Sequence, residues 1–235
     1  MSDPTPDGNA DDIADRIRKA WREESPAGWF EPLYAEAKAG RAQVPWALME
    51  PNPQLVAWLD AHPVTAGETP SALVVGCGLG DDAQVLAQRG YDVVAFDISP
   101  SAIAWAQSRF PPHQRVQYTA VDLFEAPESW RGRFDFVFEC RNIQALPHTL
   151  ADSAMNAIAG FVKAGGDLLV LCHGREPHEP KDGIPWPLSR AELETFRRVG
   201  LVEVQFSEQL LRGKRRFAVE YHKPDDDTIS KTERE

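Results

Sequence analysis

The chain has few cysteines and no long hydrophobic segment. Its three cysteines, Cys77, Cys140 and Cys172, lie in or beside predicted buried strands and have no metal-ligand spacing. No apolar run approaches the length of a membrane span, and no basic segment followed by an apolar stretch comes after Met1. We therefore expect no metal site, no membrane partner and a soluble protein of a reducing, cytoplasmic compartment.

Basic residues are scarce relative to acidic ones. The sequence has 25 lysines and arginines against 36 aspartates and glutamates, which gives a net charge of −11. A surface with this balance repels the phosphates of nucleic acids and of anionic lipids. We therefore expect no nucleic acid partner. We also expect a small-molecule partner and a chain that is monomeric or weakly dimeric.

The length of 235 residues suits one large α/β domain with a sizeable core. We expect a disordered N-terminus over residues 1–10, a single domain over 11–223 and a charged, flexible tail over 224–235. The first part of the domain, 11–50, is expected to be helical, and it opens with an amphipathic pattern over 11–24.

The centre of the pattern is a strand, a glycine turn, a helix and a second strand. In chain order these are an apolar run over 72–75, glycines at positions 76, 78 and 80, a helical stretch over 83–89, and a second apolar run over 93–96 that stops at Asp97. A ligand can approach such a glycine turn closely because the backbone there is bare. Asp97 lies 97 − 78 = 19 residues after Gly78, where an acid accepts hydrogen bonds from both hydroxyls of a ribose. This order predicts the first half of a nucleotide-binding βαβ unit.

The residues that follow the glycines indicate which nucleotide binds. A dinucleotide fingerprint has its third glycine where this chain has Asp81, and Asp82 comes next. Two carboxylates would repel a pyrophosphate, whereas adenosine that carries a cationic sulfonium and an amino-acid end has no phosphate. The pattern therefore favours S-adenosylmethionine over NAD.

The remaining patterns extend this unit into a doubly wound sheet. Further strands are predicted over 116–120, 134–139, 167–172, 201–207 and 216–221, and further helices over 55–62, 100–110, 150–163 and 190–199. The loop over 174–188 is long and rich in proline, glycine and charge, so we expect it to form a wall of the active site. Its expected contacts with the acceptor are His178, Trp186 and Pro187.

The segment VGCGLGDD at 75–82, followed by DIS at 97–99, resembles the thiopurine and thiol/halide methyltransferase group of the class I S-adenosylmethionine-dependent methyltransferases. Further matches follow the order of that group: Tyr34, VPW at 44–46, PNP at 51–53, ALP at 145–147, the segment 161–171 and GIPWPLS at 183–189. The resemblance implies a Rossmann-like, seven-stranded α/β sheet with an antiparallel last strand. It also implies S-adenosylmethionine as the cofactor and N-terminal lid helices that cover it.

Two positions depart from the pattern of that group. Val74 stands where the class often has an acid, and Ala47 follows the Pro-Trp pair where the group usually has aspartate. The first departure removes one expected polar contact with the cofactor, and the second bears on the choice of acceptor.

The resemblance and the strand ends together give the predicted cofactor-binding residues. They are Trp29 and Trp46 in the lid, Gly76, Cys77 and Gly78 in the glycine turn, Asp97 and Ile98 after the second strand, Asp122, Leu123 and Phe124 after the third, and Glu139 at the end of the fourth. Asp122 is expected against the adenine amino group, although an aspartate after a strand is also a common turn residue or helix cap. The lid aromatics are expected to exclude water or simply to pack the helices together.

Charged residues at the strand ends are the predicted catalytic groups. Glu139 and Arg141 follow one strand and His173 ends another, at the sheet edge that faces the ligand. Arg141 is expected to pair with the methionine carboxylate of the cofactor or with Glu139. A general base, if one is used, is Glu139, His173 or His148, in descending order of preference.

The predicted activity is methyl transfer to a small molecule. A methyl group on a sulfonium is already activated, so the enzyme has to place the nucleophile in line and keep water out of the path. We predict S-methylation of a thiol or other soft nucleophile first, and N- or O-methylation of a small aromatic or heteroaromatic compound second. Two predictions of other classes stay open: an NAD-dependent oxidoreductase and a non-catalytic adenosyl-binding protein.

Overall fold

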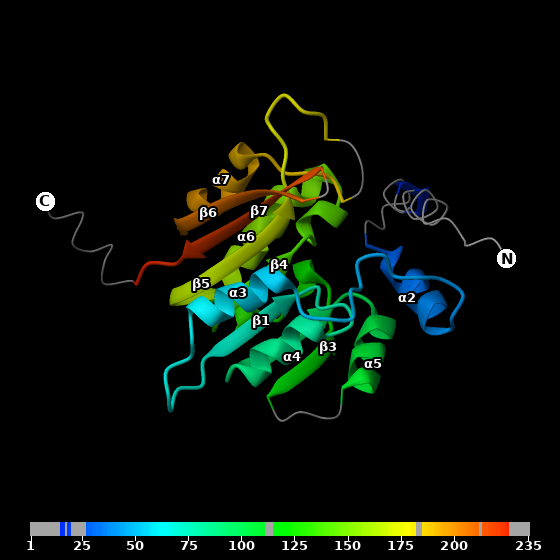
Figure 1. Cartoon of the computed structure of the whole chain (residues 1–235), viewed down its shortest axis with the longest axis horizontal. Helices are drawn as coiled ribbons and strands as arrows, with labels where there is room; N and C mark the ends of the chain where they lie inside the picture. Colours follow the sequence, from blue (N-terminus) through cyan, green and yellow to red (C-terminus); the bar gives the residue numbers. More distant parts are fainter. Residues whose placement is uncertain are drawn as a thin grey trace, which may run out of the picture.

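Seven strands form one sheet through the middle of the molecule (Figure 1). The computed structural model describes residues 15, 16, 18, 19, 27–110, 115–181, 185–211 and 213–225. The predictions for residues 1–10, for most of the helix over 11–24 and for the tail beyond 225 lie outside these residues.

The strands follow the order β3-β2-β1-β4-β5-β7-β6 across the sheet. Their bounds are β1 Ser71–Val75, β2 Asp92–Asp97, β3 Val116–Ala120, β4 Phe134–Cys140, β5 Val162–His173, β6 Val202–Leu211 and β7 Lys214–His222. Neighbouring strands from β3 to β5 run parallel, and β7 is antiparallel to both β5 and β6. The predicted seven-stranded, Rossmann-like sheet with an antiparallel last strand is confirmed.

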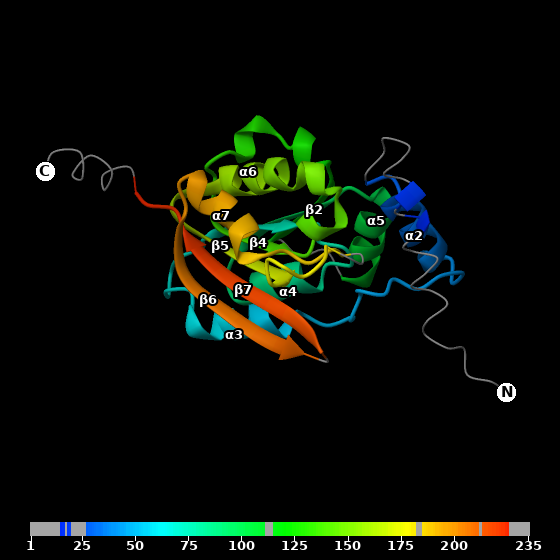
Figure 2. The same ribbon diagram turned by 90° about the horizontal axis from the view of Figure 1, so that it is seen from above.

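Helices cover both faces of the sheet because its central strands are apolar on both sides. Alternate residues of β1 enter two separate cores. One core includes α3 (Pro53–Ala61) and α4 (Asp81–Gln88), and the other includes α6 (Ala151–Phe161) and α7 (Arg190–Arg198). Figure 2 shows these two layers on opposite sides of the sheet. None of the described helices is long and apolar enough to cross a membrane.

Helix α2 (Phe30–Lys38) lies against α5 (Pro100–Arg109) at one end of the sheet (Figure 1). Glu31 of α2 accepts hydrogen bonds from the hydroxyl of Ser99 (2.5 Å) and from both the hydroxyl (2.5 Å) and the backbone N–H (3.0 Å) of Ser101. These bonds fix the start of α2 to the start of α5. Since α5 follows β2, the predicted lid segment is held beside the carboxyl end of β2.

Two features of the sequence-based outline are wrong. The helix predicted over 150–163 ends at Phe161, and its last two residues begin β5, where Val162 pairs with Phe134 of β4. Pairing with an existing strand outweighs the weak helical pattern there. The C-terminal hairpin is also longer than predicted: its first strand continues past residue 207 to Leu211, and its second strand begins at Lys214 rather than at residue 216.

Candidate active site

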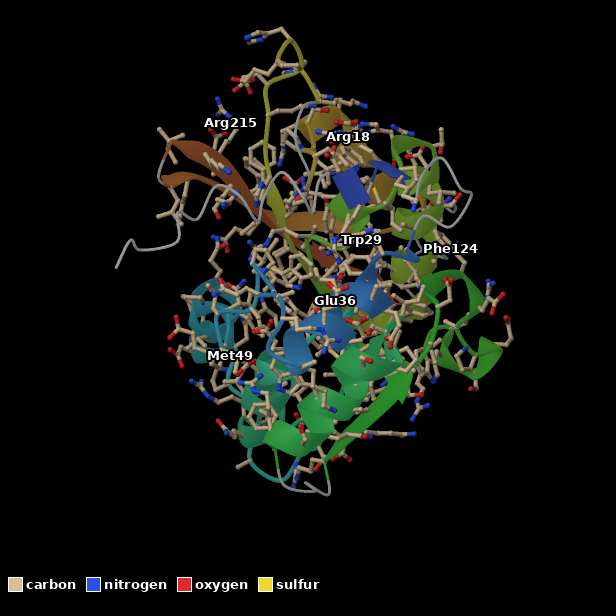
Figure 3. The ribbon with its side chains drawn as sticks, turned by 90° about the vertical axis from the view of Figure 1, so that its right-hand side faces the viewer. Arg18, Trp29, Glu36, Met49, Phe124 and Arg215 are labelled. Atoms are coloured by element: carbon tan, nitrogen blue, oxygen red, sulfur yellow. The ribbon has the colours of Figure 1, made fainter. Side chains whose placement is uncertain are left out.

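A cavity of about 360 Å³ opens at the carboxyl ends of β1, β2, β4 and β5, a volume typical of small-molecule sites. The segment around α2 forms one wall, and Figure 3 shows α2 and Trp29 on this side of the molecule. The polar and charged side chains on the cavity wall are Glu50, Asn52, Asp81, Asp82, Asp97, Arg141, Asn142, His173 and Arg216.

The glycine turn after β1 passes between the sheet and the loop after β4. Gly76 has a φ of +58°, and a Cβ on this residue would lie 1.9 Å from Oδ1 of Asn142. The Asn142 side chain in turn donates from Nδ2 to the carbonyl oxygen of Val75 (2.8 Å). A residue with a side chain therefore does not fit at position 76, and the bare backbone forms part of the cavity wall.

Asp97 ends β2 and is almost completely buried, yet it lines the cavity. Its two carboxylate oxygens accept hydrogen bonds from the backbone N–H groups of Gly78 and Ser99, each at 2.9 Å. Burial raises the pKa of Asp97 to about 6. The carboxylate is held rigidly by backbone donors and keeps lone pairs that can accept further hydrogen bonds.

Four aromatic residues of the lid segment, Trp29, Phe30, Tyr34 and Trp46, pack against one another and line the cavity. Trp29 stacks on Phe30 with 3.8 Å between ring centroids, and the edge of Trp46 meets Trp29 at 5.6 Å. The indole N–H of Trp46 donates to the Tyr34 hydroxyl (2.9 Å), whereas the indole N–H of Trp29 is buried without a partner among the described residues. The same four aromatic residues therefore pack against one another and line the cavity.

Arg216 is one of the cavity residues that the sequence reasoning missed. It pairs with His173 across β5 and β7, so the two side chains lie on the same face of the sheet. One terminal nitrogen of its guanidinium, Nη1, is buried without a partner among the described residues. The alternating pattern of a strand marks Arg215 and Arg216 as facing opposite ways, but only the pairing with β5 decides which of them faces the cavity.

Arg141 follows β4 with a φ of +66°, and it lines the cavity. Its Nε donates to the sulfur of Cys140 (3.4 Å), and it forms no ion pair within the described part of the chain. The expected alternative in which Arg141 pairs with Glu139 is therefore not what the structure contains. Its charge remains available to a ligand.

Glu139 is completely buried behind the cavity wall rather than on it. Its Oε1 accepts from the backbone N–H groups of Asn142 (2.6 Å) and Ile143 (3.1 Å), and its Oε2 is buried without a partner among the described residues. Burial raises the pKa of Glu139 to about 7. The side chain shapes the turn that presents Arg141, and its predicted contacts with the cofactor and the acceptor stay a prediction.

Replacing Glu139 with glutamine is expected to change how stability depends on pH. A raised pKa in the folded state means that Glu139 favours folding at low pH and loses this contribution as the pH rises through about 7. The melting temperature of the wild type relative to Glu139→Gln should therefore fall from about pH 5 to about pH 8. The control is Glu128→Gln, which makes the same change at an exposed glutamate. Parallel curves for wild type and Glu139→Gln would contradict the assignment.

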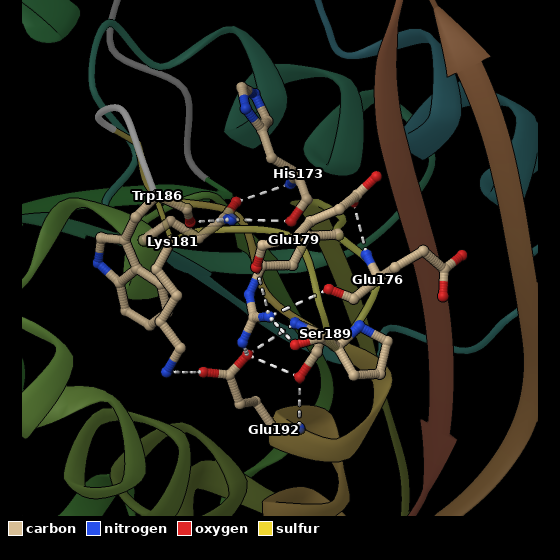
Figure 4. Close-up of polar contacts among 10 residues, drawn as sticks. His173, Glu176, Glu179, Lys181, Trp186, Ser189 and Glu192 are labelled. Carbon is tan, nitrogen blue, oxygen red and sulfur yellow. Dashed lines mark hydrogen bonds and ion pairs between the residues drawn. The ribbon is translucent and has the colours of Figure 1, made fainter.

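His173 reaches the cavity from the end of β5, as predicted. Burial, followed by the positive charges of Arg216 and Arg141, lowers its pKa to about 3. The buried amide of Gln144 accepts from the backbone N–H of His173 (2.7 Å) and donates to its carbonyl oxygen (2.9 Å). The same amide nitrogen donates to the carbonyl oxygen of Trp186 (2.5 Å), so Gln144 fixes both ends of the loop (Figure 4).

Arg175 holds the segment that immediately follows β5. Arg175 donates to the carbonyl oxygens of three loop residues and forms an ion pair with Glu192 at 2.8 Å (Figure 4). Pro185 lines the cavity. Trp186, which was predicted to contact the acceptor, is instead buried in the core, where its indole N–H donates to the carbonyl oxygen of Leu146 (2.6 Å). The other predicted residues of this region that do not line the cavity are His148, His178 and Pro187.

The predicted cofactor residues divide into two groups. The residues that line the cavity are Trp29, Trp46, Gly76, Cys77 and Asp97, and those that do not are Gly78, Ile98, Asp122, Leu123, Phe124 and Glu139. Asp122 accepts from the backbone N–H of Phe124 (2.8 Å) and so caps the short 3-10 turn Leu123–Glu125, while Phe124 is exposed. The adenine contact of Asp122 therefore stays a prediction.

The residues present fit an adenosyl ligand. The bare backbone at Gly76, the carboxylate of Asp97 and the unpartnered indole N–H of Trp29 provide close approach, a ribose acceptor and a spare donor in one cavity. Nothing in this set requires a phosphate, and two of the cavity residues beside the glycine turn, Asp81 and Asp82, are acids.

Several known proteins with similar sequences or folds are methyltransferases. The chain is 29% identical to the probable thiol methyltransferase 2 of Arabidopsis thaliana over 187 aligned residues. The aligned region covers 77% of this chain and 75% of that protein. It is 23% identical to a 2-heptyl-1-hydroxyquinolin-4(1H)-one methyltransferase of Mycobacteroides abscessus over 185 aligned residues. That aligned region covers 78% of this chain and 74% of that protein.

The fold is similar to that of the 1,6-didemethyltoxoflavin-N1-methyltransferase of Burkholderia thailandensis, solved with 1,6-didemethyltoxoflavin and S-adenosylhomocysteine. The TM-score is 0.61 at 18% identity, over 96% of this chain and 94% of that chain. The sequence model of the thiopurine S-methyltransferase family matches residues 36–223, which is most of the chain. The chain therefore belongs to the thiopurine S-methyltransferase family and is an S-adenosylmethionine-dependent methyltransferase.

Proposed function

We propose that this protein methylates the sulfur atom of a small-molecule thiol, or a similar soft anionic nucleophile. The observation that carries the proposal is the division of charge within one cavity. Carboxylates (Asp82 and Asp97) lie at the β1 and β2 side, whereas the guanidinium group of Arg216 lies at the β7 side, beyond Arg141 after β4. A cationic sulfonium suits the first side, and an anionic nucleophile suits the second.

The cofactor side is formed by Asp97, the glycine turn and the lid. Asp97 would accept hydrogen bonds from the ribose hydroxyls, and Gly76 would allow the backbone to approach the ligand. Trp29 and Trp46 would cover it and exclude water. When bound, S-adenosylmethionine supplies a methyl group on a positively charged sulfur, already activated for transfer.

The acceptor side is formed by Arg216, His173 and Pro185. Arg216 would stabilise the thiolate form of the acceptor, because a guanidinium beside a thiol lowers its pKa. The thiol proton then leaves to solvent before transfer, and no base from the chain is needed. With a pKa near 3, His173 is neutral at physiological pH and serves as a hydrogen-bond partner rather than a proton acceptor.

The relatives support sulfur as the site of methylation but leave a second candidate. The name of the Arabidopsis relative specifies a thiol, whereas the names of the other two proteins specify nitrogen heterocycles. The aromatic wall of the cavity favours an acceptor with a ring, so N- or O-methylation of a heteroaromatic compound is the second candidate. Because the chain belongs to a methyltransferase family, we do not propose an NAD-dependent oxidoreductase or a non-catalytic adenosyl-binding protein.

The test is turnover on a panel of acceptors, with S-adenosylhomocysteine release measured by mass spectrometry. Aromatic thiols and thiocyanate should be methylated faster than phenols and heteroaromatic amines. Arg216→Met should lower kcat/KM for a thiol by roughly tenfold to a hundredfold and move the acidic limb of its pH profile upward, since the thiolate loses a charge-assisted partner. The neighbouring Arg215→Met, which removes the same charge from a side chain paired with Glu208, should change neither. Methylation of phenols or amines without thiols would favour the second candidate.

A further inference from the structure

Two adjacent carboxylates open α4, and their surroundings differ. Asp81 is held by Arg109 through two hydrogen bonds, Nη1 to Oδ2 at 2.5 Å and Nη2 to Oδ1 at 2.7 Å. Asp82 has no ion pair within the described part of the chain. Its hydrogen bond is to the backbone N–H of Asn52, which donates to Oδ1 at 2.7 Å. The charge of Asp81 is therefore neutralised within the fold, whereas that of Asp82 is not.

Asp82 lines the cavity although it is largely buried. Burial raises the pKa of Asp82 to about 6, so the side chain is still charged at neutral pH. Arg141 is close enough to lower that pKa, yet no oxygen of Asp82 comes within ion-pair distance of its guanidinium. A carboxylate and a guanidinium thus line the same cavity without neutralising each other, an arrangement that suits a ligand carrying both charges.

The sheet order places this pair on a particular side of the ribose acid. Strand β1, which leads into the glycine turn and Asp82, lies between β2, which ends in Asp97, and β4, which leads to Arg141. Asp82 and Arg141 therefore lie on the β1 side of a ribose bound by Asp97, away from β3. In an adenosyl cofactor the group attached beyond the ribose is an amino acid, which carries an α-ammonium and an α-carboxylate.

We infer that Asp82 binds the α-ammonium group of the cofactor, opposite Arg141, which binds the α-carboxylate; this inference rests on the cofactor orientation of the proposed function. The residues of β1 that line the cavity, Val74 and Val75, are apolar, so the carboxylate comes from the helix after the turn rather than from the strand. If Asp82 served only as the acceptor for the Asn52 N–H, its replacement would not distinguish ligands with the amino-acid end from ligands without it.

The experiment compares two ligands that differ in the amino-acid end. S-adenosylhomocysteine carries it, and 5′-methylthioadenosine lacks it. In Asp82→Asn the amide oxygen can still accept from the Asn52 N–H, so the fold is kept and only the charge is lost. Calorimetric titration should show S-adenosylhomocysteine binding weakened by about tenfold or more, the loss expected for one charge-assisted hydrogen bond, and 5′-methylthioadenosine binding unchanged.

Two further variants complete the test. Arg141→Met should also weaken S-adenosylhomocysteine selectively, whereas Asp81→Asn, whose carboxylate is bound by Arg109, should affect both ligands equally. Equal effects of Asp82→Asn on the two ligands, or no effect on either, would overturn the inference. Failure of the wild type to bind S-adenosylhomocysteine would overturn the cofactor orientation with it. A selective loss without any thiol turnover would support the inference and overturn the proposed acceptor.

Discussion

Gly76→Ala is expected to abolish cofactor binding and to destabilise the fold. The backbone at Gly76 has a φ of +58°, where an L-residue costs about 1–2 kcal/mol. The new Cβ would also lie 1.9 Å from Oδ1 of Asn142, so either the turn or the Asn142 side chain must move, at a further cost of about 1–3 kcal/mol. Either movement displaces the part of the cavity wall against which the cofactor would bind. Chemical denaturation and calorimetric titration with S-adenosylhomocysteine measure the two effects.

Gly132→Ala is the matched control for this substitution. Gly132 has nearly the same φ, +59°, but a Cβ there meets no atom within 4 Å. It should cost only the backbone term, about 1–2 kcal/mol, and leave cofactor affinity unchanged. If Gly76→Ala is no worse than Gly132→Ala in stability and in affinity, then the close packing of Asn142 on the glycine turn does not constrain the site.

Asp97→Ala has the second large expected effect. A carboxylate that accepts from two ribose hydroxyls forms two charge-assisted hydrogen bonds, each worth about 1.5–3 kcal/mol, so affinity for S-adenosylhomocysteine should fall by at least roughly a hundredfold. The substitution also leaves the backbone N–H groups of Gly78 and Ser99 without their acceptor. Calorimetric titration measures the loss. Asp92→Ala, at the exposed opposite end of the same strand, is the control and should bind normally.

The pH dependence of binding gives an independent check on Asp97. Its pKa in the free protein is about 6, and two hydroxyl donors favour the ionised form. Affinity should therefore be constant above about pH 7 and should decline as the pH falls through about 6. Since Asp82 has a similar pKa, the measurement is made with 5′-methylthioadenosine, which lacks the ammonium group. A pH-independent affinity for that ligand would argue against Asp97 as the ribose acceptor.

The elements that the sequence predicted well are those with a local cause. The glycines of the turn after β1, the helix that follows them and Asp97 at the end of β2 all lie within about thirty residues, where backbone preference and apolar periodicity act directly. The capping box at Ser189 and Glu192 is another local signal that the structure contains. The sequence predicts the end of an element less well where a strand continues a helical pattern, as at Val162. There the pairing with β4 decides where the helix ends and the strand begins.

The candidate site also combines residues placed by local sequence with residues placed by the tertiary structure. Asp97 and Gly76 follow from a spacing along the chain and line the cavity, whereas Glu139 lies behind the cavity wall. A charged residue at a strand end was expected to face the ligand, but its side chain turns back to accept from the N–H groups of Asn142 and Ile143. A carboxylate next to a tight turn often binds backbone donors in this way, and only coordinates separate the two roles.

By itself, the sequence determined the class of this protein: the glycine turn, the ribose acid and the aspartate at position 81, where a dinucleotide fingerprint has its third glycine, already favour an adenosyl cofactor over a dinucleotide. The tertiary structure alone decided which charges meet in the cavity. Asp82, Arg141 and Arg216 come from three parts of the chain, and their meeting depends on strand order and on the register of β5 with β7. Register is set by long-range packing rather than by local preference, and a shift of one residue would send Arg216 to the other face of the sheet.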